Sequence, residues 1–148
     1  MTSDERTDSS VLLEVEGLKT HFATEDGLVR SVDGLDLSLP RGKTVCVVGE
    51  SGCGKSITAR SILGLIDPPG RIVEGSIKWY GDDPAAPVDL VRLDPRSEAM
   101  RRFRGKEIAM VFQEPMASLS PMYTVEQHLI EAVRLHLPLS KKEARDLA

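Results

Sequence analysis

The sequence predicts an α/β fold, and three adjoining segments carry that prediction. Residues 44–48 (TVCVV) are apolar and β-branched, as in a buried parallel strand. Residues 49–56 read GESGCGKS, and residues 57–63 (ITARSIL) have the pattern of a helix. The first of these two matches G-x-x-x-x-G-K-[ST], a loop that binds nucleotide phosphates when it follows a strand and opens a helix. The sequence therefore predicts a P-loop nucleotide-binding site.

An antiparallel β region is expected before this loop. Its strands are residues 13–18, 28–32 and 35–39. In the last of them leucines alternate with Asp36 and Ser38, which gives one buried face. A turn at residues 40–42 then leads into the strand at 44–48.

Two further elements are expected after the loop helix. Residues 75–80 predict a strand. A helix is expected to begin at Asp94-Pro95, because Asp is a good N-cap and Pro fits the first helical position, and to stop at Gly105. The second half of this helix and the residues just after it are basic. A solvated basic face is favourable at a helix C-terminus, and contact with acidic lipid or nucleic acid is the alternative interpretation. These basic residues are Arg96, Arg101, Arg102, Arg104 and Lys106.

The chemistry of a triphosphate explains the loop. Its charged oxygens need converging N–H donors, and glycines let the backbone approach without side chains in the way. The helix N-terminus adds unpaired amides and the positive end of its dipole. Lys55 is expected to reach the β and γ phosphates, and the Ser56 hydroxyl to ligate Mg²⁺. The expected cofactor-binding residues here are Gly49, Glu50, Ser51, Gly52, Cys53, Gly54, Lys55, Ser56 and Ile57.

The residues downstream argue against a guanine nucleotide. A GTPase carries D-x-x-G after a later strand and N-K-x-D for the base. Here Asp67-Pro68-Pro69-Gly70 follows the loop helix at a turn, and N-K-x-D does not occur. Residues 108–112 (IAMVF) predict a strand that ends in Gln113-Glu114-Pro115. Gln113 stands where a Walker B strand would end in Asp.

The segment FQEPMASLSP at 112–121 resembles the Q-loop region of ATP-binding subunits of ABC transporters, in the branch that imports dipeptides, oligopeptides or nickel. Glu50 in the P-loop is also typical of that branch. The resemblance covers nearly all of residues 12–148. It implies an α/β P-loop NTPase of ABC type, with an N-terminal antiparallel β subdomain, part of a RecA-like core and the start of a helical subdomain. The implied limits are the β subdomain and P-loop core at 11–113, and the Q-loop with the start of the helical subdomain at 114–148. Residues 1–10 are polar and acidic and are expected to form a flexible tail.

The same resemblance implies roles for individual residues. Phe22 falls where the family places an aromatic that stacks on adenine; a core or hairpin aromatic is the alternative. Gln113 is the Q-loop glutamine, which contacts Mg²⁺ and the region of the attacking water. The implied catalytic residues are Lys55 and Gln113, the implied metal ligands are Ser56 and Gln113, and the cofactors are ATP and Mg²⁺.

The resemblance also implies partners. These are transmembrane permease subunits and a second ATP-binding subunit, identical or paralogous, with the chain held peripherally at the cytoplasmic face of the cell membrane. No nucleic acid is expected. Peptide is the expected cargo and nickel the alternative.

Several motifs of the family do not occur in these 148 residues. They are the signature loop, the Walker B Asp with its catalytic Glu, the D-loop and the switch His; His21, His128 and His136 do not occupy the switch position. The chain is therefore expected to be the N-terminal portion of a longer ATPase, able to bind ATP but not to hydrolyse it alone. Two alternatives are the P-loop lobe of an ABC-superfamily DNA-repair ATPase and a non-catalytic half-domain that senses ATP.

The residues after Gln113 predict helices. Capping boxes begin at Thr124 and Ser140, and one helical face is apolar through Val125, Leu129, Ala132 and Val133. In the family this region receives a short permease helix. The candidates for lining that groove are Met116, Leu119, Met122 and Tyr123, and burial in the subdomain core explains them equally well.

Composition fits a soluble globular chain of one domain, with 41% hydrophobic and 28% charged residues. No stretch approaches the roughly 18 apolar residues of a membrane span. Residues 1–10 lack the apolar segment of a signal peptide. Cys46 and Cys53 have neither metal-ligand spacing nor a partner motif, which suits a reducing compartment. Cys53 lies inside the loop, so Mg-ATP is expected to protect it from a thiol reagent.

Overall fold

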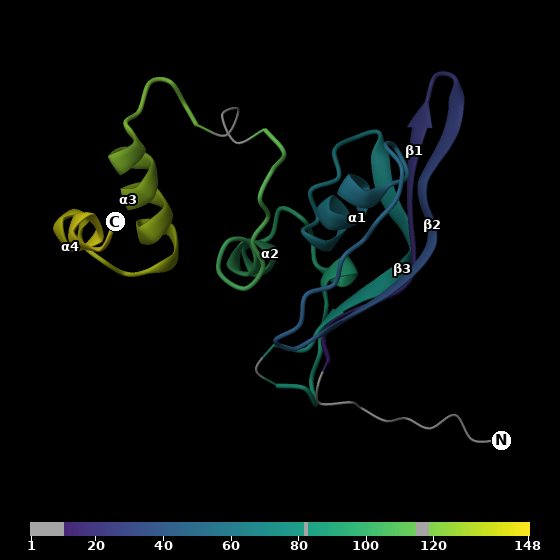
Figure 1. Cartoon of the computed structure of the whole chain (residues 1–148), viewed down its shortest axis with the longest axis horizontal. Coiled ribbons are helices and arrows are strands. Elements are labelled where there is room, and N and C mark those ends of the chain that lie inside the picture. The colour runs from purple at the N-terminus through teal and green to yellow at the C-terminus, as the bar shows by residue number, and fades with distance from the viewer. Residues whose placement is uncertain (1–10, 82, 115–118) are drawn as a thin grey trace. The chain divides into compact units, whose positions relative to one another are not determined.

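The computed structural model describes residues 11–81, 83–114 and 119–148, and the chain forms two compact units that divide between Arg101 and Arg102. The first unit contains an antiparallel sheet and the helix that follows the P-loop, and the second contains a pair of helices (Figure 1). The sequence-based expectation of a mixed α/β chain is confirmed.

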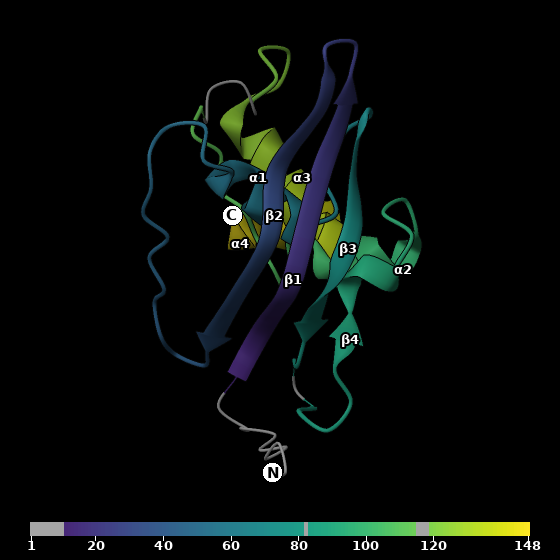
Figure 2. The same ribbon diagram turned by 90° about the vertical axis from the view of Figure 1, so that its right-hand side faces the viewer.

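The sheet has four strands in the order β2-β1-β3-β4, and all of its pairings are antiparallel. The strands are β1 (Val11–Thr24), β2 (Gly27–Pro40), β3 (Gly70–Trp79) and β4 (Val88–Asp89). β1 and β2 form a long hairpin, visible face-on in Figure 2. The two strands expected at 28–32 and 35–39 are therefore one strand, because the hairpin pairing continues along the whole of β2.

A bulge in β1 changes which of its residues face inward. Leu13 and Val15 are buried in the first half of the strand, and Leu18 and Thr20 are buried in the second half. Between them the pairing with β2 shifts register, at a point where Gly17 has a φ of 55°. Side chains alternate along a strand, so one extra residue moves the inward face from odd to even positions. Thr20, and Phe22 two residues later, consequently lie on the same face of β1.

The strand expected at 44–48 is wrong. Residues 43–50 have no regular secondary structure and are exposed, with Val48 at 92%. Figure 2 shows the segment as an extended loop outside the sheet. A strand forms only where its backbone groups find partners, and within the described residues no strand pairs with this segment.

The strand expected at 108–112 is also wrong. Its one pairing among the described residues is an isolated bridge between Arg104 and Ile108, and Val111 is 92% exposed. An apolar, β-branched segment predicts strand propensity but does not supply a neighbouring strand.

The helix expected at Asp94 begins later and is shorter. After a 3₁₀ turn at Leu90–Arg92, helix α2 covers Glu98–Phe103. Asp94 accepts the amide hydrogen of Arg96 at 2.8 Å and closes a turn, while the Ser97 hydroxyl accepts from the amide of Met100 at 3.2 Å. Ser97 is thus the N-terminal cap, because its oxygen satisfies an amide of the first helical turn.

The second unit contains helices α3 (Val125–His136) and α4 (Lys141–Leu147). Both expected capping boxes are confirmed, with Thr124 and Ser140 as caps. The helices pack through buried Ile130 and Ala144. The expected apolar face is a poor guide to packing, because Val125 is 65% exposed and Leu129 45%.

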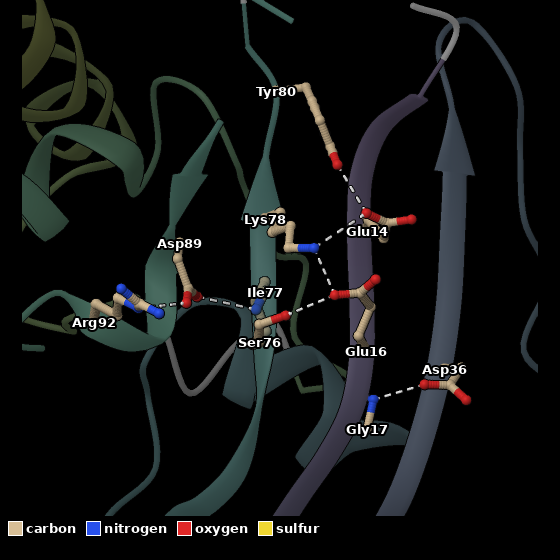
Figure 3. Close-up of polar contacts among 10 residues, drawn as sticks. All are labelled: Glu14, Glu16, Gly17, Asp36, Ser76, Ile77, Lys78, Tyr80, Asp89 and Arg92. Carbon is tan, nitrogen blue, oxygen red and sulfur yellow. Dashed lines mark hydrogen bonds and ion pairs between the residues drawn. The ribbon is translucent and has the colours of Figure 1, made fainter. Parts of the chain in front are cut away.

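The outer face of the sheet carries a polar network between β1 and β3 (Figure 3). Lys78 donates to Glu16 at 2.6 Å, and the Tyr80 hydroxyl donates to Glu14 at 2.8 Å. The ammonium of Lys78 lowers the pKa of Glu16, and the hydrogen bond to Glu14 raises the pKa of Tyr80. Exposed pairs of this kind contribute less than about 1 kcal/mol each. We assign the network to strand register, not to ligand binding.

Candidate functional site

Helix α1 (Lys55–Ile62) begins directly after the glycine-rich loop, as the sequence predicts, although the strand expected before the loop is absent from the described residues. Gly54 is the N-cap residue, with a φ of 92° and a ψ of 0°. The intrahelical ladder begins with the amide of Thr58, which donates to the Gly54 carbonyl at 2.8 Å. In that geometry the amides of the first helical residues are not used by the ladder and converge at the loop.

The Lys55 side chain folds back across the loop. Its ammonium donates to the carbonyl oxygens of Gly49 at 2.7 Å and Glu50 at 2.6 Å, and lies 3.4 Å from Sγ of Cys53. A cation is thus placed beside the amide-lined loop. The two carbonyl oxygens carry only partial negative charge, whereas phosphate oxygens carry formal charge, so an anionic ligand would hold the ammonium more strongly than the carbonyls do.

A bulge in β2 fits against the start of the helix. Thr20 and His21 are consecutive in β1 and pair with Val32 and Arg30, so Ser31 is an extra residue in β2. Its carbonyl oxygen lies so close to Gly54 that a Cβ at that position would overlap it. Glycine is therefore required at Gly54 by the neighbouring strand as well as by the positive φ.

A buried pair of hydroxyl groups joins β1 to α1. Oγ1 of Thr20 and Oγ of Ser61 are 2.8 Å apart, and these residues are 0% and 2% exposed. The Ser61 hydroxyl donates to the carbonyl of Ile57 at 2.7 Å. Since a hydroxyl has one proton, Thr20 must be the donor in the pair.

Phe22 lies on the same strand, half-buried beside the segment that follows α1. It pairs with Gly70 of β3, and a Cβ on Gly70 would overlap its ring and come within 2.8 Å of Ile66. The absence of a side chain at Gly70 thus leaves the space that the Phe22 ring occupies. This packing supports the alternative that Phe22 is a hairpin aromatic, and it leaves stacking on a base as a prediction.

The site residues expected from the sequence fall in both units. Phe22 and the nine residues from Gly49 to Ile57 belong to the first unit, and Gln113 belongs to the second, where it is exposed. The role of Gln113 with Lys55 and Ser56 therefore remains a prediction.

Ser31, Thr20 and Ser61 support the loop in the structure, and no sequence motif marks them. The one signal was that Thr58 and Ser61, spaced as neighbours on a helix face, are polar residues in a segment expected to pack on a sheet.

The residues just before α3 are hydrogen-bonded to its first turn through His128. Its Nε2 accepts the amide hydrogen of Ser120 at 3.0 Å, and its Nδ1 lies 2.9 Å from the Thr124 carbonyl. Of the residues expected to line a groove, Leu119, Met122 and Tyr123 are exposed, and Met116 lies outside the described residues. Tyr123 borders a shallow hollow of about 390 Å³ over α3 and the start of α4.

Known proteins match most of this chain. A family profile described as "ABC transporter" matches residues 32–148. The oligopeptide transport ATP-binding protein AppD of Bacillus subtilis is 42% identical over 140 residues, which are 94% of this chain and 40% of that protein. The dipeptide transport ATP-binding protein DppD of Escherichia coli is 39% identical over 137 residues, which are 93% of this chain and 39% of that protein. The chain thus spans about 40% of the length of these relatives.

Solved structures show the same fold. The dimeric structure of MJ0796, a bacterial ABC transporter cassette, superposes with a TM-score of 0.73 at 19% identity, over 91% of this chain and 53% of that one. A post-hydrolysis state of the same cassette, bound to ADP and Pi, gives a TM-score of 0.70 at 19% identity and the same coverage.

Proposed function

This chain belongs to the ABC transporter family, and we propose that it is the ATP-binding part of a subunit that powers import of peptides across the cytoplasmic membrane. The observation that carries the proposal is the P-loop at the start of α1, with Lys55 folded across it. The names of the similar proteins, which refer to oligopeptide and dipeptide transport, support peptide as the cargo.

The proposed binding step is an exchange of partners by Lys55. Its ammonium leaves the carbonyls of Gly49 and Glu50 and pairs with the β and γ phosphates, while loop amides take the remaining oxygens. Phe22 provides a π face for the adenine. The residues present fit such a ligand, because the loop offers amides, a cation and no side chain at Gly54.

A magnesium ion at the loop would need the nucleotide. Among the described residues there is no cluster of three or more His, Cys, Asp or Glu side chains that could hold a metal ion. The exposed Ser56 hydroxyl, phosphate oxygens and Gln113 are the proposed ligands. When bound, the ion would neutralise phosphate charge.

The proposed partners are transmembrane permease subunits and a second ATP-binding subunit, at the cytoplasmic face of the membrane. No helix among the described residues is both long enough and apolar enough to span a bilayer. The proposed membrane association is peripheral and depends on the permease. The exposed residues Leu119, Met122 and Tyr123 are the proposed contacts with it.

Cys53 offers a test of ATP binding with a control built into the chain. Both cysteines are free and exposed, but only Cys53 lies in the loop, 3.4 Å from the Lys55 ammonium. Saturating Mg-ATP should slow labelling of Cys53 by a thiol reagent at least about tenfold, because the bound phosphates cover the loop, and should leave Cys46 unchanged. Peptide mapping by mass spectrometry measures both rates. Labelling of Cys53 at the same rate with and without ATP would contradict the proposed site.

A further inference from the structure

We propose that Thr20 is a positioning residue for nucleotide: through its hydrogen bond to Ser61 it fixes the P-loop helix relative to Phe22, and so sets the distance between the phosphate and base subsites. The proposal rests on the proposed function, since it assumes that the phosphates bind at the loop and the base at Phe22.

The contact is suited to fixing a position. Both hydroxyl groups are buried, at 0% and 2% exposure, and the Thr20 proton, the Ser61 oxygen, the Ser61 proton and the Ile57 carbonyl form one directed chain. A buried hydroxyl without a partner is costly, so sliding α1 along β1 by even part of a residue is unfavourable. An apolar contact at this place would tolerate that movement more easily.

The two ends of this chain of hydrogen bonds lie near the two subsites. Ile57 is in the first turn of α1, next to Lys55 and Ser56. Thr20 and Phe22 are two residues apart on β1, on the face where the β1 alternation places them together. One hydrogen-bonded link therefore connects the strand that carries the aromatic ring with the helix turn that carries the phosphate ligands.

A second contact limits how α1 can approach the hairpin. The bulged Ser31 carbonyl of β2 meets the helix at Gly54, and Thr20 of β1 meets it at Ser61, two turns further along. Ser31 prevents the helix from coming closer to the hairpin at its start. The Thr20–Ser61 bond then fixes its position along β1.

A ligand that occupies both subsites should bind more weakly when this hydrogen bond is lost. A ligand that occupies only one subsite should keep its affinity. Thr20→Val keeps the shape of the side chain and removes the hydroxyl. We expect it to weaken Mg-ATP binding about 3- to 10-fold and to change binding of magnesium tripolyphosphate, which has no base, less than about twofold. Ser61→Ala should weaken Mg-ATP binding relative to tripolyphosphate binding by the same ratio as Thr20→Val. The double variant should bind Mg-ATP no more weakly than Ser61→Ala does, because both single changes remove the same hydrogen bond.

Isothermal titration calorimetry of each variant with both ligands measures these affinities. Thr24→Val is the matched control, because Thr24 is exposed on the same strand and its hydroxyl donates only within the hairpin turn, to the Gly27 carbonyl at 2.8 Å. Thr20→Ser, which keeps the hydroxyl, should bind both ligands as the wild type does. If Thr20→Val does not fold, Ser61→Ala removes the same bond from the helix side. Its change in affinity for Mg-ATP relative to tripolyphosphate then tests the proposal.

The outcomes separate the two claims. If wild-type protein binds neither ligand, the proposed function is wrong and the inference falls with it. If wild-type protein binds ATP and the variants weaken ATP and tripolyphosphate equally, or weaken neither, the proposed function stands and the positioning role of Thr20 is wrong.

Discussion

Replacing Lys55 with alanine is expected to reduce the affinity for Mg-ATP by about 10- to 100-fold, the loss that follows from hydrogen bonds to a charged group worth about 1.5–3 kcal/mol. The structure explains why the loss should appear in binding and not in folding. Lys55 is exposed enough to exchange partners, and the two bonds that it makes in the loop are to the carbonyls of Gly49 and Glu50. Without the ammonium those carbonyls can be hydrated, so the loop remains intact.

Equilibrium dialysis with radiolabelled ATP measures this effect. Lys43→Ala is the matched control, because Lys43 is an exposed lysine just before the loop and lies outside the glycine-rich segment. The Lys43→Ala variant should bind ATP within about twofold of the wild type, since a solvent-exposed charge outside the loop is largely screened by salt. Equal affinity of Lys55→Ala and the wild type would mean that the phosphates do not bind where Lys55 lies.

Replacing Gly54 with alanine is expected to destabilise the first unit by about 2–6 kcal/mol. One part is the strain of a side chain at a φ of 92°, which costs about 1–3 kcal/mol. The other part is overlap with the Ser31 carbonyl, for which about 1–3 kcal/mol is typical of overpacking. The bulge in β2 cannot easily yield, because Ser31 is flanked by residues paired with β1.

Gly52→Ala separates these two parts. Gly52 also has a positive φ, of 83°, but no atom lies within 4 Å of a Cβ placed there. It should therefore show only the strain, about 1–3 kcal/mol. Urea unfolding followed by the fluorescence of Trp79, the single tryptophan and a residue of β3, reports on the first unit. If the two variants unfold at the same urea concentration, the contact between Gly54 and Ser31 does not constrain the loop.

Local features of this chain could be predicted from its sequence. The start of α1 after the glycine-rich loop and the caps at Thr124 and Ser140 each depend on a few consecutive residues, and the structure contains all three. Their physical causes, namely free amides at helix ends and side chains that accept from them, act over one turn.

Features that depend on distant partners could not be predicted. The segments 44–48 and 108–112 have strand composition, but within the described residues neither lies in the sheet, because pairing is a property of two segments and not of one. The cap at Ser97 was missed because two acceptable caps, Asp94 and Ser97, compete within four residues.

The support of the candidate site is also non-local. The bulge at Ser31 arises from a mismatch in the pairing of β1 with β2, and no residue type marks it. The bond from Thr20 to Ser61 joins residues 41 positions apart. Sequence patterns therefore predict the groups that are proposed to contact nucleotide, and the structure identifies the neighbouring groups that hold them in place.

Photolabelling with 8-azido-ATP reports on the positions of the base and the phosphates together. If adenine stacks on Phe22 while the phosphates occupy the loop, one tryptic peptide, residues 20–30, should be labelled, because it contains Phe22. Labelling should be blocked by excess Mg-ATP, and Lys55→Ala should reduce it to the extent that it weakens ATP binding. A label on another peptide, or one on residues 20–30 that survives both excess ATP and loss of Lys55, would contradict the account.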